Sequence, residues 1–204
     1  MEELDVIELF IDDDNDLNGI EAISIVEHPA IEEDFIALKE QGKLELAKVD
    51  EEKRILMGAA LIPNKKIYRN NGLQEYYIFF SHETVKKASE LFLTKGKQNN
   101  STLEHEDSLE GLSVVESWIV EDDVKDKSRK YNLHVPVGTW MVSVKVNNDE
   151  IWQEFVKTKR VKGFSIEGFF SDKLEMNKQV IDDELTDEET EWYNKIKDIL
   201  KKLD

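Results

Sequence analysis

Apolar and polar positions alternate in short runs along this chain, and the runs predict strands. Alternation with period two, in runs rich in β-branched and aromatic residues, is typical of a half-buried strand. Pro, Asn and Asp lie between several of the runs and favour turns. The pattern predicts strands at residues 6–11, 20–26, 54–62, 75–80, 102–106, 113–120, 138–146 and 163–170.

Helical spacing of apolar residues appears in fewer places. Ser81 is a good N-cap for a helix over 82–93, whose apolar positions fall on one face. Asn148 or Asp149 can cap a second helix ending near residue 159. Thr186 and Glu189 form a capping box that opens a third, amphipathic helix. Short strands with interspersed helices indicate an α+β fold around a largely antiparallel sheet or small barrel.

The same pattern divides the chain into three parts. Residues 1–170 form the predicted main domain, 171–185 a polar linker and 186–204 the C-terminal amphipathic helix. The linker is polar enough to serve as a site of self-cleavage. The apolar stripe of the last helix packs either on the protein's own core or on a partner.

Composition narrows the range of functions. No run of eighteen apolar residues occurs and the N-terminus is acidic, so neither a membrane span nor a signal peptide is expected and the protein should work in a cytoplasm. The chain has no Cys, which excludes disulfides, thiolate ligands and a cysteine nucleophile. Its net charge of −18 disfavours binding to nucleic acid or to an anionic membrane.

Familiar catalytic motifs are missing from the sequence. There is no HExxH, no GxSxG, no P-loop and no GxGxxG, so a zincin metalloprotease, an α/β-hydrolase and nucleotide chemistry are not expected, and no cofactor is predicted. A candidate nucleophile is Ser165, within GFSIEG at 163–168. On a strand Ser165 and Glu167 would share a face, and the nearby glycines would leave room for a substrate backbone and for amides that bind an oxyanion. A structural serine would show the same pattern.

His105 lies in an acidic stretch, LEHED, at residues 103–107. Three interpretations are open at this point. It is a solvated histidine in a charged turn, a divalent-cation ligand together with Glu104, Glu106 or Asp107, or a general base whose imidazolium is stabilised by a carboxylate.

Six motifs in order give residues 61–170 a resemblance to the XkdF-like phage serine proteases. They are LIPNKKIYR at 61–69, YYIFFSHETVKKASELFL at 76–93, STLEHE at 101–106, VVESWIVED at 114–122, VPVGTWMVSVKV at 135–146 and VKGFSIEGFF at 161–170. That family is related to prohead proteases, which resemble herpesvirus assembly proteases: β-barrels ringed by helices. The resemblance implies that Ser165 is the nucleophile and His105, on a neighbouring strand, its general base.

The third catalytic residue is less well defined by the resemblance. Related proteases carry an acid or a second histidine in a strand resembling E-V-S-L-V-x-x-P-A after the serine. The nearest match here is AISIVEHPA at 22–30, before the serine, which suggests circular permutation, and it places Ala22 where the acid would be. Glu116 ranks first as the acid that orients His105, because its strand is expected to pair with that of the histidine, followed by Glu21 and Glu167.

The resemblance also implies a biological setting. Substrates would be the major capsid protein and scaffold segments, and the protease itself, inside a phage procapsid in the host cytoplasm. The protein would be homo-oligomeric or associated with the shell. The alternative is a catalytically inactive scaffold or assembly protein with the same fold.

Overall fold

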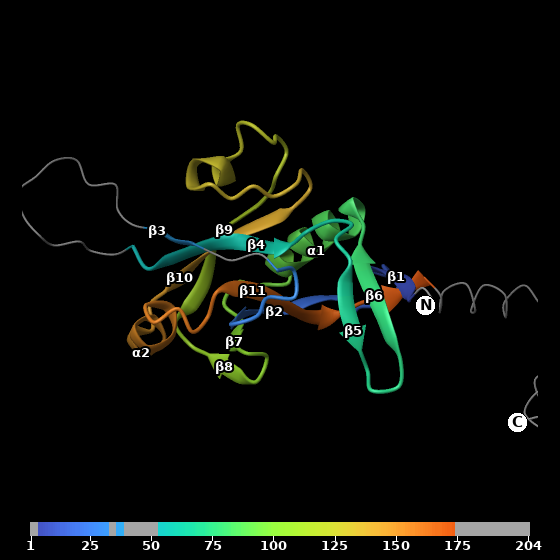
Figure 1. Ribbon diagram of the computed structural model, residues 1–204, viewed down its shortest axis with the longest axis horizontal. Coiled ribbons are helices and arrows are strands. Elements are labelled where there is room, and N and C mark those ends of the chain that lie inside the picture. The colour runs from blue at the N-terminus through green and yellow to red at the C-terminus, as the bar shows by residue number, and fades with distance from the viewer. Residues whose placement is uncertain (1–3, 33–35, 39–52, 174–204) are drawn as a thin grey trace, which may run out of the picture.

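A computed structural model describes residues 4–32, 36–38 and 53–173 of the chain (Figure 1). Most of the predicted linker at 171–185 and all of the predicted C-terminal helix at 186–204 lie outside the described residues.

Twelve described strands form three four-stranded sheets. The first has the order β12 (Ser171–Asp172), β1 (Asp5–Phe10), β6 (Glu75–Phe80), β5 (Ile67–Asn70). The second is β3 (Ile36–Leu38), β4 (Ile55–Leu61), β10 (Trp140–Val146), β9 (Leu112–Ile119). The third is β11 (Gly163–Phe169), β2 (Gly19–Val26), β7 (Ser101–Leu103), β8 (Asp107–Leu109). Pairing is antiparallel except for β1 with β6 and β2 with β7.

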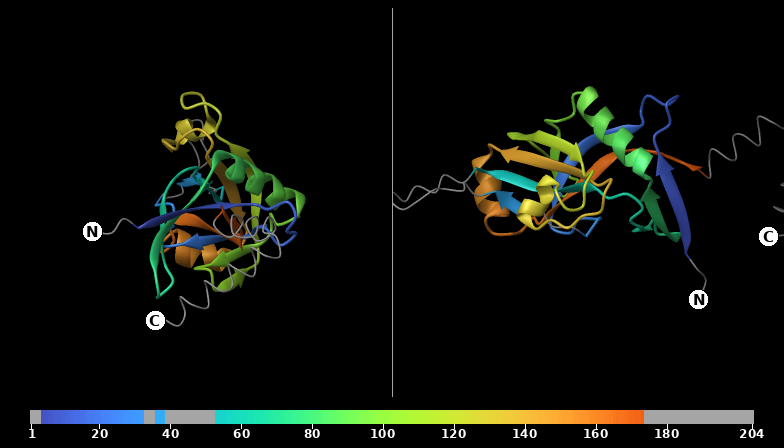
Figure 2. Two further views of the ribbon diagram at one scale, coloured as in Figure 1. Left: turned by 90° about the vertical axis from the view of Figure 1, so that its right-hand side faces the viewer. Right: turned by 90° about the horizontal axis from the view of Figure 1, so that it is seen from above.

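One long helix covers part of the sheets. Helix α1 (His82–Thr94) packs on β2, β9 and β10, as Figures 1 and 2 show. Its N-cap Ser81 accepts a hydrogen bond from the Thr84 amide at 3.3 Å. Its buried face ends at Phe92, whose ring meets Trp140 edge-on with centroids 5.5 Å apart. Both side chains are fully buried, so this contact joins the helix to the second sheet at the centre of the core.

The remaining helical segments are short. A single turn, α2 (Asp149–Ile151), is capped by Asn148 and continues into a π-helix, η2 (Trp152–Val156). A 3-10 helix, η1 (Lys127–Tyr131), lies in the long connection between β9 and β10. No helix in the described part of the chain is long and apolar enough to cross a membrane.

The α+β class is confirmed, and the strands predicted within the described residues are confirmed with small changes at the ends, except that β7 stops at Leu103 and the predicted strand at 102–106 is otherwise a turn. The helix predicted over 82–93 is confirmed, and the one predicted from 149 is a shorter, partly π-helical segment. Strands β3, β5, β8 and β12 were not predicted, because each is only two to four residues long.

The expectation of a closed barrel ringed by helices is wrong for the described residues. Strand β11 lies beside β4 but forms no ladder with it. A cavity lined by Ala60 and Leu61 of β4 and by Ser165 and Ile166 of β11 lies between the two strands. Side chains and open space therefore separate the two backbones where a barrel would need hydrogen bonds. The similarity to the herpesvirus protease fold is not confirmed.

Candidate active site

Ser165 lies in the middle of β11, an edge strand of the third sheet, directly opposite Ser24 of β2. Ser24 is in turn paired with Thr102 of β7. Thr102 is paired with Ser108 of β8. Residues directly opposite one another project to the same face of a sheet, so four hydroxyl side chains form a row across the four strands, with Ser165 and Ser108 at its two ends. Ser165 retains 9% exposure, whereas Ser24 is fully buried.

His105 lies at the tip of the β7–β8 hairpin and not on a strand as predicted. Glu104 and His105 have φ angles of 51° and 63°, and the Glu106 amide donates to the Leu103 carbonyl at 3.0 Å. Two successive left-handed residues make a tight hairpin turn, a conformation that costs free energy in residues other than glycine. Contacts elsewhere in the fold must therefore hold the turn.

Ser24 provides such a contact. Its hydroxyl accepts a hydrogen bond from the His105 amide at 3.1 Å and donates to the Thr102 carbonyl at 3.3 Å. The buried hydroxyl thus ties the turn to the strand that faces Ser165. This role of Ser24 was not predicted from the sequence, where the only signal was a hydroxyl residue between Ile23 and Ile25.

Glu167 provides the carboxylate that contacts the imidazole. Its Oε1 lies 3.1 Å from His105 Nδ1 and also accepts from the Thr102 hydroxyl. An ionised carboxylate can only accept, so Nδ1 carries the hydrogen, and in the neutral imidazole Nε2 keeps its free lone pair. The His105 side chain is 42% exposed, which leaves Nε2 open to a reacting group.

The acid ranked first lies elsewhere. Glu116 was expected on a strand next to that of His105, but β9 pairs with β10 in the second sheet. Its carboxylate binds the Lys127 ammonium and accepts from the Ser143 hydroxyl at 2.6 Å. Burial raises the pKa of Glu116, but the two hydrogen bonds outweigh this and lower its pKa overall. Glu116 is therefore part of a structural ion pair and does not orient His105.

The acid ranked second also has another partner. Glu21 lies on β2 and forms an ion pair with Lys97, which follows α1. It neighbours Ala22, whose side chain shares the face of Ser24 and Ser165, so Glu21 projects to the opposite face. Of the three acids considered from sequence, only Glu167 reaches His105.

Ser165 and His105 come to the same face of the third sheet, although they are not in direct contact. Within the described residues no hydrogen bond joins the Ser165 hydroxyl to the imidazole. Ser24 links the two residues, because it lies directly opposite Ser165 and accepts a hydrogen bond from the main-chain amide of His105. Catalytic hydrogen bonds are often long before substrate binds. The group can supply a hydroxyl, an imidazole with a free Nε2 and a carboxylate on Nδ1.

A cation site around His105 has less support. Among the residues that the structure describes, no group of three or more His, Asp or Glu side chains is placed to hold a metal ion. Glu104, Glu106 and Asp107 are exposed, and Glu104 instead accepts from the Glu27 amide at 2.7 Å.

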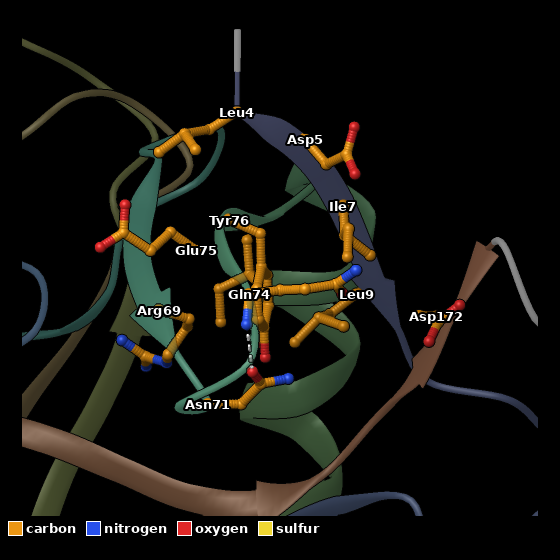
Figure 3. A pocket seen from close by; sticks show the side chains of 11 residues that line it. Leu4, Asp5, Ile7, Leu9, Arg69, Asn71, Gln74, Glu75, Tyr76 and Asp172 are labelled. Carbon is orange, nitrogen blue, oxygen red and sulfur yellow. Dashed lines mark hydrogen bonds between the residues drawn. The ribbon is translucent and has the colours of Figure 1, made fainter. Parts of the chain in front are cut away.

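Two hollows adjoin the first sheet. One, of about 220 Å³, contains Ser165, and the larger, of about 990 Å³, lies on the first sheet away from both Ser165 and His105. They share Leu9, Arg69 and Ile78. Figure 3 shows the larger hollow, with Arg69 on one side and Asp5 and Asp172 on the other. The hollow beside the candidate nucleophile therefore opens toward the first sheet.

Comparisons with known proteins bear on the family of this chain. No curated protein and no solved structure matches the chain significantly. One family model matches residues 43–175, about two thirds of the chain, and spans Ser165, His105 and Glu167 but not β1 or β2. This chain therefore belongs to the family described as "Putative phage serine protease XkdF".

Proposed function

We propose that the protein is a serine endopeptidase of phage head maturation that cleaves capsid and scaffold segments. The observation that carries the proposal is the hydrogen bond that His105 Nδ1 donates to the Glu167 carboxylate on the sheet face that also presents Ser165. A carboxylate on Nδ1 and a free Nε2 are what a general base requires. Membership of a phage serine protease family supports the same activity.

In the proposed mechanism His105 Nε2 takes the proton of the Ser165 hydroxyl as the oxygen attacks a peptide carbonyl. Glu167 keeps the imidazole in the correct tautomer and stabilises the imidazolium. His105 then protonates the leaving amine, and a water molecule, activated in the same way, hydrolyses the acyl-enzyme. β11 is an edge strand, so main-chain amides along its free side are candidates to bind the oxyanion.

The proposed substrates are the major capsid protein, scaffold segments and the protease itself, within a procapsid in the host cytoplasm. The proposal includes self-association or association with the shell, and no nucleic acid or membrane partner. The chain has 45 acidic and 27 basic residues, and this excess of negative charge repels phosphate groups. It therefore supports the absence of a nucleic acid or membrane partner from the proposal.

Replacing Ser165 by alanine tests the proposal. The full-length chain would be co-expressed with the phage's capsid and scaffold proteins, and new N-termini would be identified by mass spectrometry. We expect Ser165→Ala to abolish processing while leaving the melting temperature nearly unchanged. Ser108→Ala is the matched control, since Ser108 is an exposed serine on β8 of the same sheet; this variant should process normally.

Two outcomes would contradict the proposal. Processing that persists in Ser165→Ala would exclude this serine as the nucleophile. Absence of processing by the wild-type chain, together with no labelling of Ser165 by a fluorophosphonate, would favour the inactive scaffold protein.

A further inference from the structure

The cavity beside Ser165 contains one charged side chain. Its other residues, apart from Ser165 itself, are apolar or glycine: Leu9, Ala30, Ile31, Ala60, Leu61, Ile67, Ile78, Phe80, Ile166, Gly168 and Phe170. The charged residue is Arg69. A cation in an apolar cavity is unusual in a chain with a net charge of −18, where most surfaces would present carboxylates.

Arg69 has no acidic partner in the part of the chain that the structure describes. Its one side-chain hydrogen bond runs from Nη1 to the Tyr68 carbonyl at 3.0 Å. The guanidinium is half-buried, and this burial lowers the pKa of Arg69, with Tyr76 opposing part of the effect. A partly desolvated guanidinium with unused donors is stabilised when a carboxylate binds to it.

The geometry of the first sheet directs Arg69 toward the cavity. Arg69 and buried Ile67 alternate with exposed Tyr68 and Asn70 along β5, so Arg69 projects from the inner face. Glu75, the acid nearest in sequence, also lines the larger hollow, but its carboxylate accepts a hydrogen bond from the Tyr68 hydroxyl at 2.8 Å and forms no ion pair with Arg69. Asp5 and Asp172 lie across the larger hollow from Arg69 (Figure 3). The donors of Arg69 therefore remain available where the two hollows meet.

We propose that the cavity beside Ser165 is a binding pocket for one carboxylate-bearing side chain of the substrate, and that Arg69 recognises its carboxylate. The inference rests on the proposed function, because it identifies the occupant as a part of the peptide that Ser165 attacks. A volume of about 220 Å³ corresponds to about seven water molecules, enough for a side chain the size of glutamate. The aliphatic walls would pack on its methylene groups, and the guanidinium fork would bind both carboxylate oxygens.

The first experiment measures cleavage preference. The wild-type chain, Arg69→Gln and Arg69→Glu would each digest a proteome-derived peptide library, with the cut sites read by mass spectrometry. We expect wild-type cuts to be enriched in Glu or Asp at one fixed position near the scissile bond. Arg69→Gln should lose this enrichment, and Arg69→Glu should favour Lys or Arg at the same position. Lys66→Glu, a charge reversal at an exposed position directly before β5 and outside both hollows, should keep the wild-type preference.

The second experiment does not depend on proteolysis. Full-length Ser165→Ala, labelled for NMR at its arginine side chains, would be titrated with N-acetylglutamate and with neutral N-acetylglutamine. We expect a saturable shift of the Arg69 signal with the first probe only. A thermal melt would first show that Arg69→Gln is folded. Its affinity for N-acetylglutamate should then be lower than that of the parent by at least about tenfold, because a charge-assisted pair is lost.

The outcomes separate the two hypotheses. A library that is not cleaved, with N-acetylglutamate still bound at Arg69, would reject the protease and retain the carboxylate pocket. Cleavage without an acidic preference that depends on Arg69 would retain the protease and overturn the pocket. Absence of any saturable shift of the Arg69 signal would also overturn the pocket.

Discussion

The residue opposite Glu167 on the neighbouring strand is Ala22, and its size matters for the site. Glu167 reaches past β2 to the Thr102 hydroxyl and to His105 Nδ1. A methyl group at position 22 leaves this path open, whereas a larger side chain on the same face would obstruct it. The sequence places Ala22 where related proteases carry an acid. In this structure the carboxylate comes instead from Glu167 of β11, the strand paired with β2.

Replacing Glu167 by glutamine should lower kcat by about a hundredfold or more, because loss of a triad carboxylate leaves the imidazole in the wrong tautomer. The change keeps the shape of the side chain and its hydrogen bond with Thr102. The rate of Ser165 labelling by a fluorophosphonate would measure the effect without any knowledge of the natural substrate.

Glu116→Gln is the matched control for this prediction, since it removes the same charge from an acid bound to Lys127 and Ser143. Its labelling rate should stay within about twofold of wild type, with a stability loss of about 1 kcal/mol or less for a half-exposed pair. If Glu116→Gln slowed labelling more than Glu167→Gln, the assignment of Glu167 would be wrong.

At the scale of elements, the end of β11 is shaped by a bulge between Glu167 and Gly168. The register of β11 on β2 shifts there, and Gly168 approaches the Gly19 backbone closely. A Cβ at Gly168 would lie 2.2 Å from the Gly19 carbonyl oxygen. Only glycine fits this approach, so the bulge and the direction of the preceding Glu167 side chain depend on it.

Gly168→Ala should therefore destabilise the protein by at least about 2 kcal/mol, because the clash is with backbone that cannot rotate away. It should also slow fluorophosphonate labelling at temperatures where the variant remains folded. Urea denaturation would give the first quantity. Gly72→Ala is the control, because a Cβ at Gly72 would have no atom within 4 Å and only the φ of +84° would be strained. It should lower the free energy of unfolding by about 1 kcal/mol without changing the labelling rate. Equal effects of the two variants on labelling would show that the bulge does not position the site.

At the scale of the whole molecule, the excess of negative charge opposes folding. A net charge of −18 on 204 residues brings like charges together when the chain becomes compact. The ion pairs that offset this are mostly exposed, as with Asp13 and Lys87 or Asp149 and Arg54. Exposed pairs contribute about 0–1 kcal/mol each, so repulsion should dominate.

Salt should therefore stabilise the protein. Raising NaCl from about 20 mM to about 200 mM shortens the screening length from about 20 Å to about 7 Å and weakens long-range repulsion more than contact pairs. We expect the melting temperature measured by circular dichroism to rise by several degrees. A fall over this range would mean that the ion pairs outweigh the repulsion.

Local patterns in the sequence determined most of the secondary structure. The apolar run at β4, the aromatic run at β6 and the Ser81 cap of α1 each depend on neighbours within a few residues, and each was predicted. Ser165 and His105 were proposed as nucleophile and base from the resemblance of residues 61–170 to the XkdF-like proteases, and the family model spans both residues. The two- to four-residue strands β3, β5, β8 and β12 were missed, since their pairing depends on distant segments.

Only the tertiary structure decided which carboxylate meets His105 and whether the sheets close. Glu116, Glu21 and Glu167 look alike in sequence; strand order placed the first in another sheet, and side-chain alternation turned the second away. The role of Ser24 required β2 to lie between β11 and β7, and the cavity with Arg69 required the first sheet to face β11. These contacts join residues far apart in the chain. A local pattern of apolar and polar positions depends only on near neighbours, so it could not predict them.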